Sequence, residues 1–197
     1  MPRHIMPVGL LCKSIRRTWR TPQGVIRMTT AIPESILHPA SLVNELKKND
    51  VSHVVWLPDS ETNFLYHMMM EEPTLDLVPV CREGETMAVA AGLWVGGAKP
   101  VVLIQNTGVF EAGDSIRGLC LDLNQPLVML VGYRGWTRRG PTPDSAGRFI
   151  EHILHAWGIN YYLVETDEDA DRISVAFEEC ERLSRPVAVL IGTEFGS

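Results

Sequence analysis

The residues best placed to do chemistry are the carboxylates of Glu83 and Glu85, which follow directly on the apolar stretch from Leu75 to Val80. Small residues come next and predict a helix, so Glu83 lies at a strand-to-helix turn. Exposed N–H groups at a helix start favour negative charge, and open parallel sheets bind ligands at such turns. Acidic first turns are also common in ordinary helices, and spacing alone favours that structural interpretation.

Three further polar segments each follow an apolar run. They are Pro58-Asp59-Ser60-Glu61, Asn106-Thr107-Gly108 and Gly132-Tyr133-Arg134-Gly135. Because the carboxyl ends of parallel strands share one edge of a sheet, we expect these segments and the Glu83 turn to converge on one crevice. Asp59 and Ser60 also suit the N-cap of the following helix, and both interpretations can hold.

Three arginines, Arg134, Arg138 and Arg139, lie on the polar segment that runs from Gly132 to Asp144. The planar fork of a guanidinium suits a sulfonate, a phosphonate or a carboxylate. A solvated basic loop is the alternative, and for Arg138 and Arg139 the two interpretations are equally favoured.

Apolar runs alternate with helical periodicity from Pro33 onward. Strands are predicted at 54–57, 75–80, 101–105, 127–131, 161–164 and 187–191, and helices at 35–48, 63–71, after Glu83, at about 114–123, up to Trp157 and at 167–183. The strands are continuously apolar rather than alternating, which is typical of a parallel sheet covered on both faces. The predicted fold class is therefore α/β: a doubly wound, six-stranded, mostly parallel sheet with helices on both faces.

Length and composition predict one globular domain. The chain has 197 residues, of which 45% are hydrophobic and 21% charged, and no apolar run approaches the roughly 18 residues of a membrane span. We expect a basic extension at 1–32, the domain at 33–192 and a short tail at 193–197. Residues 1–27 have three interpretations: a disordered extension, an over-long start before Met28, which is the favoured one, or a transit peptide.

Residues 28–197 carry 12 Lys and Arg against 24 Asp and Glu. Such an acidic body argues against nucleic acid as the main partner. The four cysteines (Cys12, Cys81, Cys120 and Cys180) are dispersed without metal-ligand spacing. They predict a reduced, intracellular protein without a structural zinc site. We therefore expect a cytoplasmic protein, and the lack of a long apolar run predicts no membrane partner.

A family resemblance changes the interpretation of Glu83. Glu83, Gly92 nine residues later, and the turn Ala98-Lys99-Pro100 resemble the pyrimidine-binding domain of thiamine diphosphate-dependent enzymes. Glu85 does not have this nine-residue spacing to Gly92. Over about residues 36 to 192, the segments at 82–85, 105–108 and 132–135 are similar to sulfopyruvate decarboxylase alpha subunits and to the matching part of phosphonopyruvate decarboxylase.

This resemblance implies a thiamine diphosphate-binding fold and a lyase that decarboxylates an anionic 2-keto acid, such as sulfopyruvate or phosphonopyruvate. It implies Glu83 as the catalytic residue, exchanging a proton with a ring nitrogen of the cofactor's aminopyrimidine. The implied cofactor-binding residues are Pro58, Asp59, Glu83, Asn106, Thr107 and Gly108. The implied substrate residues are Ser60, Asn106 and Arg134. Asn106 stands where some keto-acid decarboxylases carry histidine, so no histidine acid-base is implied.

The resemblance also implies that this chain supplies only half of the cofactor-binding site. Such enzymes hold the diphosphate and Mg²⁺ with a Gly-Asp-Gly turn and a later Asn, whereas this chain has only Gly113-Asp114-Ser115. The chain is therefore interpreted as a pyrimidine-binding (alpha) subunit without metal ligands of its own. Its expected partners are a diphosphate-binding (beta) subunit that holds Mg²⁺ and a second copy of itself, paired through the helix from Glu83 to Gly97.

Two other functions remain open. A carboligase subunit would use the same residues as a decarboxylase. A non-catalytic binding or regulatory protein of the same fold is the other alternative, and the insertion-like segment Val109-Phe110-Glu111-Ala112 motivates it.

Overall fold

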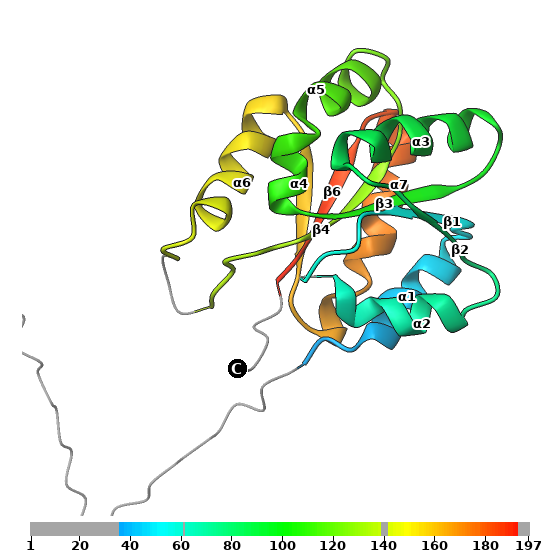
Figure 1. Ribbon diagram of the computed structural model, residues 1–197, viewed down its shortest axis with the longest axis horizontal. Coiled ribbons are helices and arrows are strands. Elements are labelled where there is room, and N and C mark those ends of the chain that lie inside the picture. Colours follow the sequence, from blue (N-terminus) through cyan, green and yellow to red (C-terminus); the bar gives the residue numbers. More distant parts are fainter. Residues whose placement is uncertain (1–35, 61, 139–141, 193–197) are drawn as a thin grey trace, which may run out of the picture. The chain divides into compact units, whose positions relative to one another are not determined.

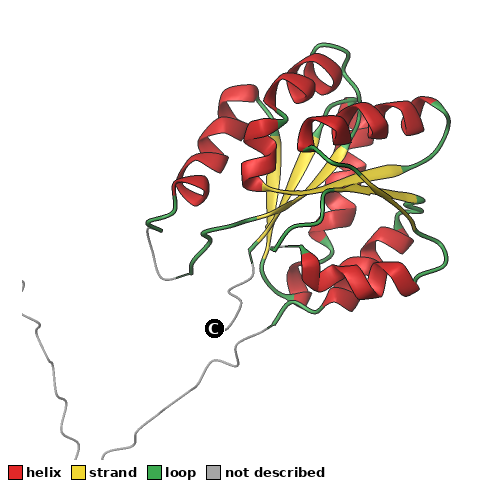
Figure 2. Ribbon diagram, in the orientation of Figure 1, coloured by secondary structure: helices red, strands yellow, loops and turns green. Residues whose placement is uncertain are grey.

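A six-stranded sheet runs through the centre of the protein (Figure 2). The computed structural model describes residues 36–60, 62–138 and 142–192. The strands are β1 (His53–Trp56), β2 (Asp76–Pro79), β3 (Pro100–Gln105), β4 (Val128–Gly132), β5 (Asn160–Val164) and β6 (Val187–Ile191). Their order is β2-β1-β3-β4-β6-β5, and all five pairings are parallel.

Helices cover both faces of the sheet (Figure 1). On one face lie α1 (Pro39–Lys48), η1 (Asn63–Leu65), α2 (Tyr66–Glu71) and α7 (Arg172–Leu183), the last preceded by the short η3 (Asp167–Asp169). On the other lie α3 (Glu83–Val95), α4 (Asn106–Glu111), α5 (Gly113–Ser115), the π-helix η2 (Ile116–Leu121) and α6 (Ser145–Trp157). The predicted doubly wound α/β fold is confirmed.

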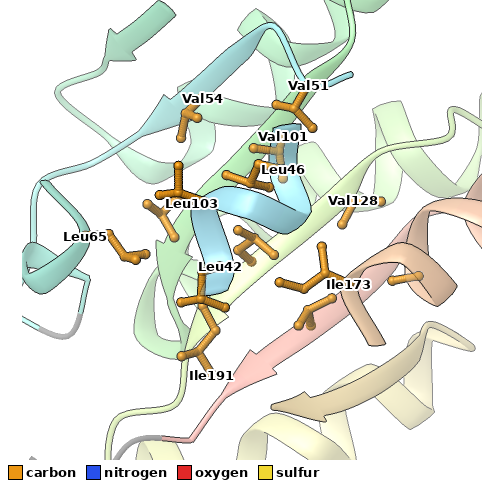
Figure 3. Close-up of a cluster of buried hydrophobic side chains, with 14 of the residues drawn as sticks. Leu42, Leu46, Val51, Val54, Leu65, Val101, Leu103, Val128, Ile173 and Ile191 are labelled. Carbon is orange, nitrogen blue, oxygen red and sulfur yellow. The ribbon is translucent and has the colours of Figure 1, made fainter. Parts of the chain in front are cut away.

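The strands are continuously apolar because each one feeds two cores. In β3, Val101 and Leu103 point into the cluster that contains Leu42 and Leu46 of α1 (Figure 3). The alternate residues Val102 and Ile104 point into the second cluster, under α3, α4 and α6. Successive side chains of a strand face opposite sides, so a strand between two helical layers must be apolar at every position.

The order of the strands reverses beside β1. From β1 the chain crosses to β2 on one side, and from β2 it returns past β1 to β3 on the other. Ligands of open α/β sheets bind outside the carboxyl ends of the strands at such a reversal. The crevice that the sequence predicts is therefore expected outside the carboxyl ends of β1 and β3.

One of the wrongly predicted helix boundaries affects the candidate site. The helix after β3 begins at Asn106 rather than near Asp114, so Asn106-Thr107-Gly108 is the first turn of a helix and not a loop. Val109 and Ala112, at 0% and 1% exposure, bury their side chains in the second core, and this burial holds the segment in helical form. The insertion-like stretch is thus part of the helical layer.

Some predictions fall on other parts of the chain. The basic extension at 1–32 and the tail at 193–197 lie outside the described residues, as do Glu61 and Arg139. Within the described ranges, no helix is both long enough and apolar enough to cross a membrane.

Leu103 tests the importance of the first core. It is fully buried at the centre of β3, and we expect Leu103→Ala to lower the free energy of unfolding by about 2–5 kcal/mol, because the cavity adds to the lost transfer energy. Urea denaturation measures this difference. Leu123→Ala, at a side chain 67% exposed, is the control and should change stability by less than about 0.5 kcal/mol.

Candidate active site

The site is built at the carboxyl edge of the sheet, around the start of α3. Glu83 is the first residue of α3 and is partly buried. Its side chain lies against Gly108 of α4: a Cβ added at Gly108 would stand 2.6 Å from Glu83 Cγ and 3.3 Å from Oε1. The predicted neighbourhood of Glu83 and the Asn106–Gly108 segment is therefore present in the fold.

Three carboxylates meet at this turn, and they differ in what they bind. Glu85 Oε2 accepts a hydrogen bond from the Cys81 backbone N–H at 3.2 Å. Glu111 accepts from the Gly84 N–H at 2.6 Å with one oxygen and from Arg82 Nε with the other. Over the described residues, no hydrogen bond or ion pair ends on the Glu83 carboxylate. Glu83 is thus the acid of this group that remains available to a ligand.

Asn106 is fully buried and links two strand ends. Its side-chain amide donates to the Arg134 carbonyl at 2.8 Å, and its Oδ1 accepts from the Thr107 N–H at 3.0 Å. These bonds hold the end of β3 to the segment after β4. Thr107, predicted on the cofactor side, is partly buried in the same turn.

The segment after β1 forms a capped turn. Asp59 accepts from both the backbone N–H and the hydroxyl of Thr62, each at 3.0 Å, and Thr62 is fully buried. Asp59 therefore closes the turn before η1, whose N-cap residue is Thr62, so the predicted helix N-cap at Asp59-Ser60 is wrong. Pro58 and Ser60 flank it and are exposed.

The arginines predicted for an anionic substrate already contact carboxylates of the same chain. Arg134 Nε donates to Asp144 at 3.0 Å, and Arg138 Nε donates to Glu165 at 2.9 Å. The pKa of Asp144 lies below its usual range, first because it accepts from the Ala146 N–H at the start of α6 and then because of Arg134. The Arg134 side chain is half exposed, and its N–H donors other than Nε make no hydrogen bond to the described residues.

Two aromatic side chains, the buried Tyr133 and the partly buried Trp136, fix the Gly132–Arg138 segment. The Tyr133 hydroxyl donates to Glu151 at 2.8 Å, and Trp136 Nε1 donates to Glu165 at 3.0 Å. Gly192, at the end of β6, leaves room for the Trp136 ring, since a Cβ there would stand 2.7 Å from Trp136 Cδ1. The segment is therefore held at both ends before any ligand binds.

The turn Ala98-Lys99-Pro100 lies at the opposite, amino-terminal edge of the sheet. Lys99 Nζ pairs with Glu181 at 2.7 Å and lies 5.4 Å from the centroid of the Phe177 ring. Both partners belong to α7, and together they border a pocket of about 290 Å³. In this structure Lys99 ties β3 to α7 and does not reach the candidate site.

Sequence analysis missed two polar residues near the site. Glu111 was assigned only to an insertion-like stretch, although its position three residues after Gly108 would place it beside the Glu83 turn once the segment is taken as helical. Gln105 ends β3, and its Oε1 is buried with no hydrogen-bond partner among the described residues. A buried acceptor left unpaired costs free energy, so Gln105 Oε1 is an unsatisfied hydrogen-bond acceptor in the isolated chain.

In the ranges 36–60, 62–138 and 142–192, no group of three or more His, Cys, Asp or Glu side chains is arranged to hold a metal ion. Gly113-Asp114-Ser115 forms the short helix α5.

The fold of this chain is shared with part of two larger proteins of known structure. Benzoylformate decarboxylase from Polynucleobacter necessarius superposes with a TM-score of 0.63 at 17% identity, over 79% of this chain and 30% of the other. A 2-oxoglutarate:ferredoxin oxidoreductase from Magnetococcus marinus superposes with a TM-score of 0.61 at 17% identity, over 81% of this chain and 30% of the other. The chain thus matches about a third of each larger enzyme, and the predicted thiamine diphosphate-binding fold is confirmed.

Particular relatives are found by sequence. Sulfopyruvate decarboxylase subunit alpha of Methanocaldococcus jannaschii is 27% identical over 152 residues, 76% of this chain and 90% of the relative. The same subunit of Methanothermobacter thermautotrophicus is 29% identical over 154 residues. Phosphonopyruvate decarboxylase of Streptomyces viridochromogenes is 27% identical over 143 residues, 72% of this chain and 36% of the relative. The predicted resemblance is confirmed, since these relatives carry the names that the sequence segments predict; no family model matches the chain.

The close contact between Glu83 and Gly108 gives a test. We expect Gly108→Ala to destabilise the protein by about 1–3 kcal/mol, because its methyl group would overlap Glu83 Cγ. Gly118→Ala is the matched control: a Cβ at this other helical glycine meets nothing within 4 Å. That change should be neutral or stabilise by up to about 1 kcal/mol. Chemical denaturation measures both, and equal effects would contradict the contact.

Proposed function

We propose that this chain is the pyrimidine-binding (alpha) subunit of a thiamine diphosphate-dependent decarboxylase that acts on an anionic 2-keto acid such as sulfopyruvate or phosphonopyruvate. One observation carries the proposal: the Glu83 carboxylate stands at the strand-to-helix turn, close to Gly108, with no hydrogen bond from the described residues. The names of the relatives support the same activity and the same division into subunits.

The residues present fit the pyrimidine side of the cofactor. Glu83 offers a carboxylate without a hydrogen bond from the described residues, and this group would share a proton with a ring nitrogen of the aminopyrimidine. Gly108 and Thr107 line the adjacent turn, and the Asp59 turn lies at the end of β1. When bound, thiamine diphosphate would supply the electron sink for the electrons left by departing carbon dioxide.

A second subunit is proposed for the diphosphate side. A Gly-Asp-Gly turn with a later Asn would hold Mg²⁺ there, whereas the related-looking Gly113-Asp114-Ser115 of this chain is helical. The unsatisfied Gln105 Oε1 at the end of β3 supports a site that is completed by further contacts.

Arg134 is the proposed contact for the anionic group of the substrate. Only its Nε is engaged by Asp144, which leaves further N–H donors of the exposed guanidinium for a sulfonate or phosphonate. Ser60 and Asn106 are the other proposed substrate residues. Asn106 already donates to the Arg134 carbonyl, so its proposed role is to hold Arg134 beside the substrate.

Reconstitution tests the proposed catalytic role. The chain is mixed with a diphosphate-binding subunit, thiamine diphosphate, Mg²⁺ and sulfopyruvate or phosphonopyruvate, and carbon dioxide release is measured. We expect Glu83→Gln to lower kcat by about 100-fold or more, because the amide cannot exchange the proton.

Glu85→Gln is the control, two residues further on and already bonded to the Cys81 N–H. It should keep kcat within about threefold, because general acid-base contributions come from the group that moves the proton. Full turnover by Glu83→Gln would refute the mechanism. Calorimetry of thiamine diphosphate binding, with and without the second subunit, distinguishes the enzyme from the non-catalytic alternative. The non-catalytic alternative predicts no binding of the cofactor in either case.

Self-association through α3 is also proposed. On the outer side of α3, Ala88, Gly92 and Val95 are exposed, with Val95 at 76%, and a Cβ at Gly92 would meet nothing within 4 Å. Ala91 faces inward instead, and its carbonyl accepts from Gln125 Nε2 at 3.1 Å. A second copy could therefore approach the outer side of α3 closely.

Gly92 is accordingly the position at which to test assembly. We expect Gly92→Trp to leave the fold intact and to dissociate the pair of chains, because overpacking a close contact costs about 1–3 kcal/mol. Sedimentation velocity measures the mass. Val175→Trp, on the exposed side of α7 across the sheet, is the control and should keep the assembly. A wild-type chain that sediments as a monomer would contradict the proposal.

A further inference from the structure

We infer that Glu111 is a positioning residue for Glu83: it caps the helix that begins with Glu83 and keeps the Arg82 guanidinium away from the Glu83 carboxylate. This inference rests on the proposed role of Glu83. Glu111 itself touches no reacting atom in the proposal, so it acts through its neighbours.

The start of α3 has no cap from its own sequence. Arg82 occupies the N-cap position, and its side chain can only donate hydrogen bonds, whereas the first N–H groups of a helix need acceptors. Glu111 supplies the missing acceptor from another helix, since its Oε2 accepts from the Gly84 N–H at 2.6 Å. The backbone on the carboxyl side of Glu83 is therefore fixed by α4.

The same short helix also fixes the side chain of Glu83. Gly108 and Glu111 are three residues apart in α4 and so share one face of it. Gly108 packs against Glu83 Cγ while Glu111 binds the next peptide group, that of Gly84. Backbone and side chain of Glu83 are thus held from one surface, which is what a precisely placed acid requires.

Charge gives Glu111 its second role. Arg82 Nε donates to Glu111 Oε1, and this bond is the largest cause of the raised pKa of Arg82; the charges of Glu85 and Glu83 contribute less. The pKa of Glu111 is lowered, first by Arg82 and also by the Gly84 N–H, so Glu111 is ionised at neutral pH. Without Glu111, the nearest acids for Arg82 would be Glu83 and Glu85, and a guanidinium bound to Glu83 would occupy the proposed proton-exchange group.

Four variants test this inference in the reconstituted enzyme. Glu111→Ala removes both bonds, and Glu111→Gln keeps an acceptor for Gly84 while losing the ion pair. The double variant Arg82→Ala/Glu111→Ala removes the displaced guanidinium as well. Asp114→Ala is the matched control: this exposed carboxylate, three residues after Glu111, pairs with Arg117 at 2.9 Å and makes no hydrogen bond or ion pair to α3 among the described residues.

We expect Glu111→Ala to lower kcat by about 10- to 100-fold with KM within about twofold, because a small misplacement of a reacting group costs that much. The double variant should recover several-fold of the lost kcat, and Asp114→Ala should match the wild type. In the isolated chain, amide hydrogen exchange at Gly84 should accelerate in Glu111→Ala and much less in Glu111→Gln.

The outcomes separate this inference from the proposed function. If Glu83→Gln abolishes turnover while Glu111→Ala keeps it, Glu111 is no positioning residue and the proposed function stands. If Glu111→Ala is slow but the double variant is equally slow or slower, the guanidinium is not the cause, and that half of the inference is wrong. Unchanged exchange at Gly84 in Glu111→Ala would refute the capping role whatever the enzyme does.

Discussion

The candidate site depends on one close contact, that between Gly108 and the side chain of Glu83. Glu83 follows β2 and Gly108 follows β3, two strands that are separated in the sheet by β1. Only because α3 and α4 lie on the same face of the sheet can the two helix starts touch. A glycine at that position leaves the space that the Glu83 side chain fills, and it leaves the carboxylate oxygens uncommitted.

Around this contact, the charges are arranged so that one acid remains available. Arg82, Arg134 and Arg138 each pair with a carboxylate of another segment, namely Glu111, Asp144 and Glu165. Each pair ties one loop at the carboxyl edge to a neighbouring element. These pairs are largely exposed and so contribute little to overall stability. Their effect is on geometry, because they determine which groups face a ligand and which are already bonded.

The relatives give this arrangement a context. In the named alpha subunits the matching segment is nearly the whole chain, 90% of it in Methanocaldococcus jannaschii, whereas in the Streptomyces phosphonopyruvate decarboxylase it is 36%. The same unit therefore occurs both as a separate subunit and as one part of a longer chain.

The local features of this protein follow from sequence alone. Continuous apolar runs predict strands that are buried on both sides, and small residues after Glu83 predict the helix that begins there. Both patterns repeat over a few residues, so the strand-to-helix turn and the element types, apart from the helix α4, can be predicted without the fold. The resemblance to a known family added the proposed chemical role of Glu83.

Only the tertiary structure decided which side chains are engaged. Asn106 is fully buried and bonded to the Arg134 carbonyl, Arg134 is paired with Asp144, and Glu111 caps α3 from another helix. Glu111 and Gly84 are 27 residues apart, and Asn106 and Arg134 are 28 apart. Sequence periodicity carries no information on such pairs, because it reports which face of an element is apolar and not which element packs beside it. The order of the strands, which fixes those neighbours, exists only once the chain is folded.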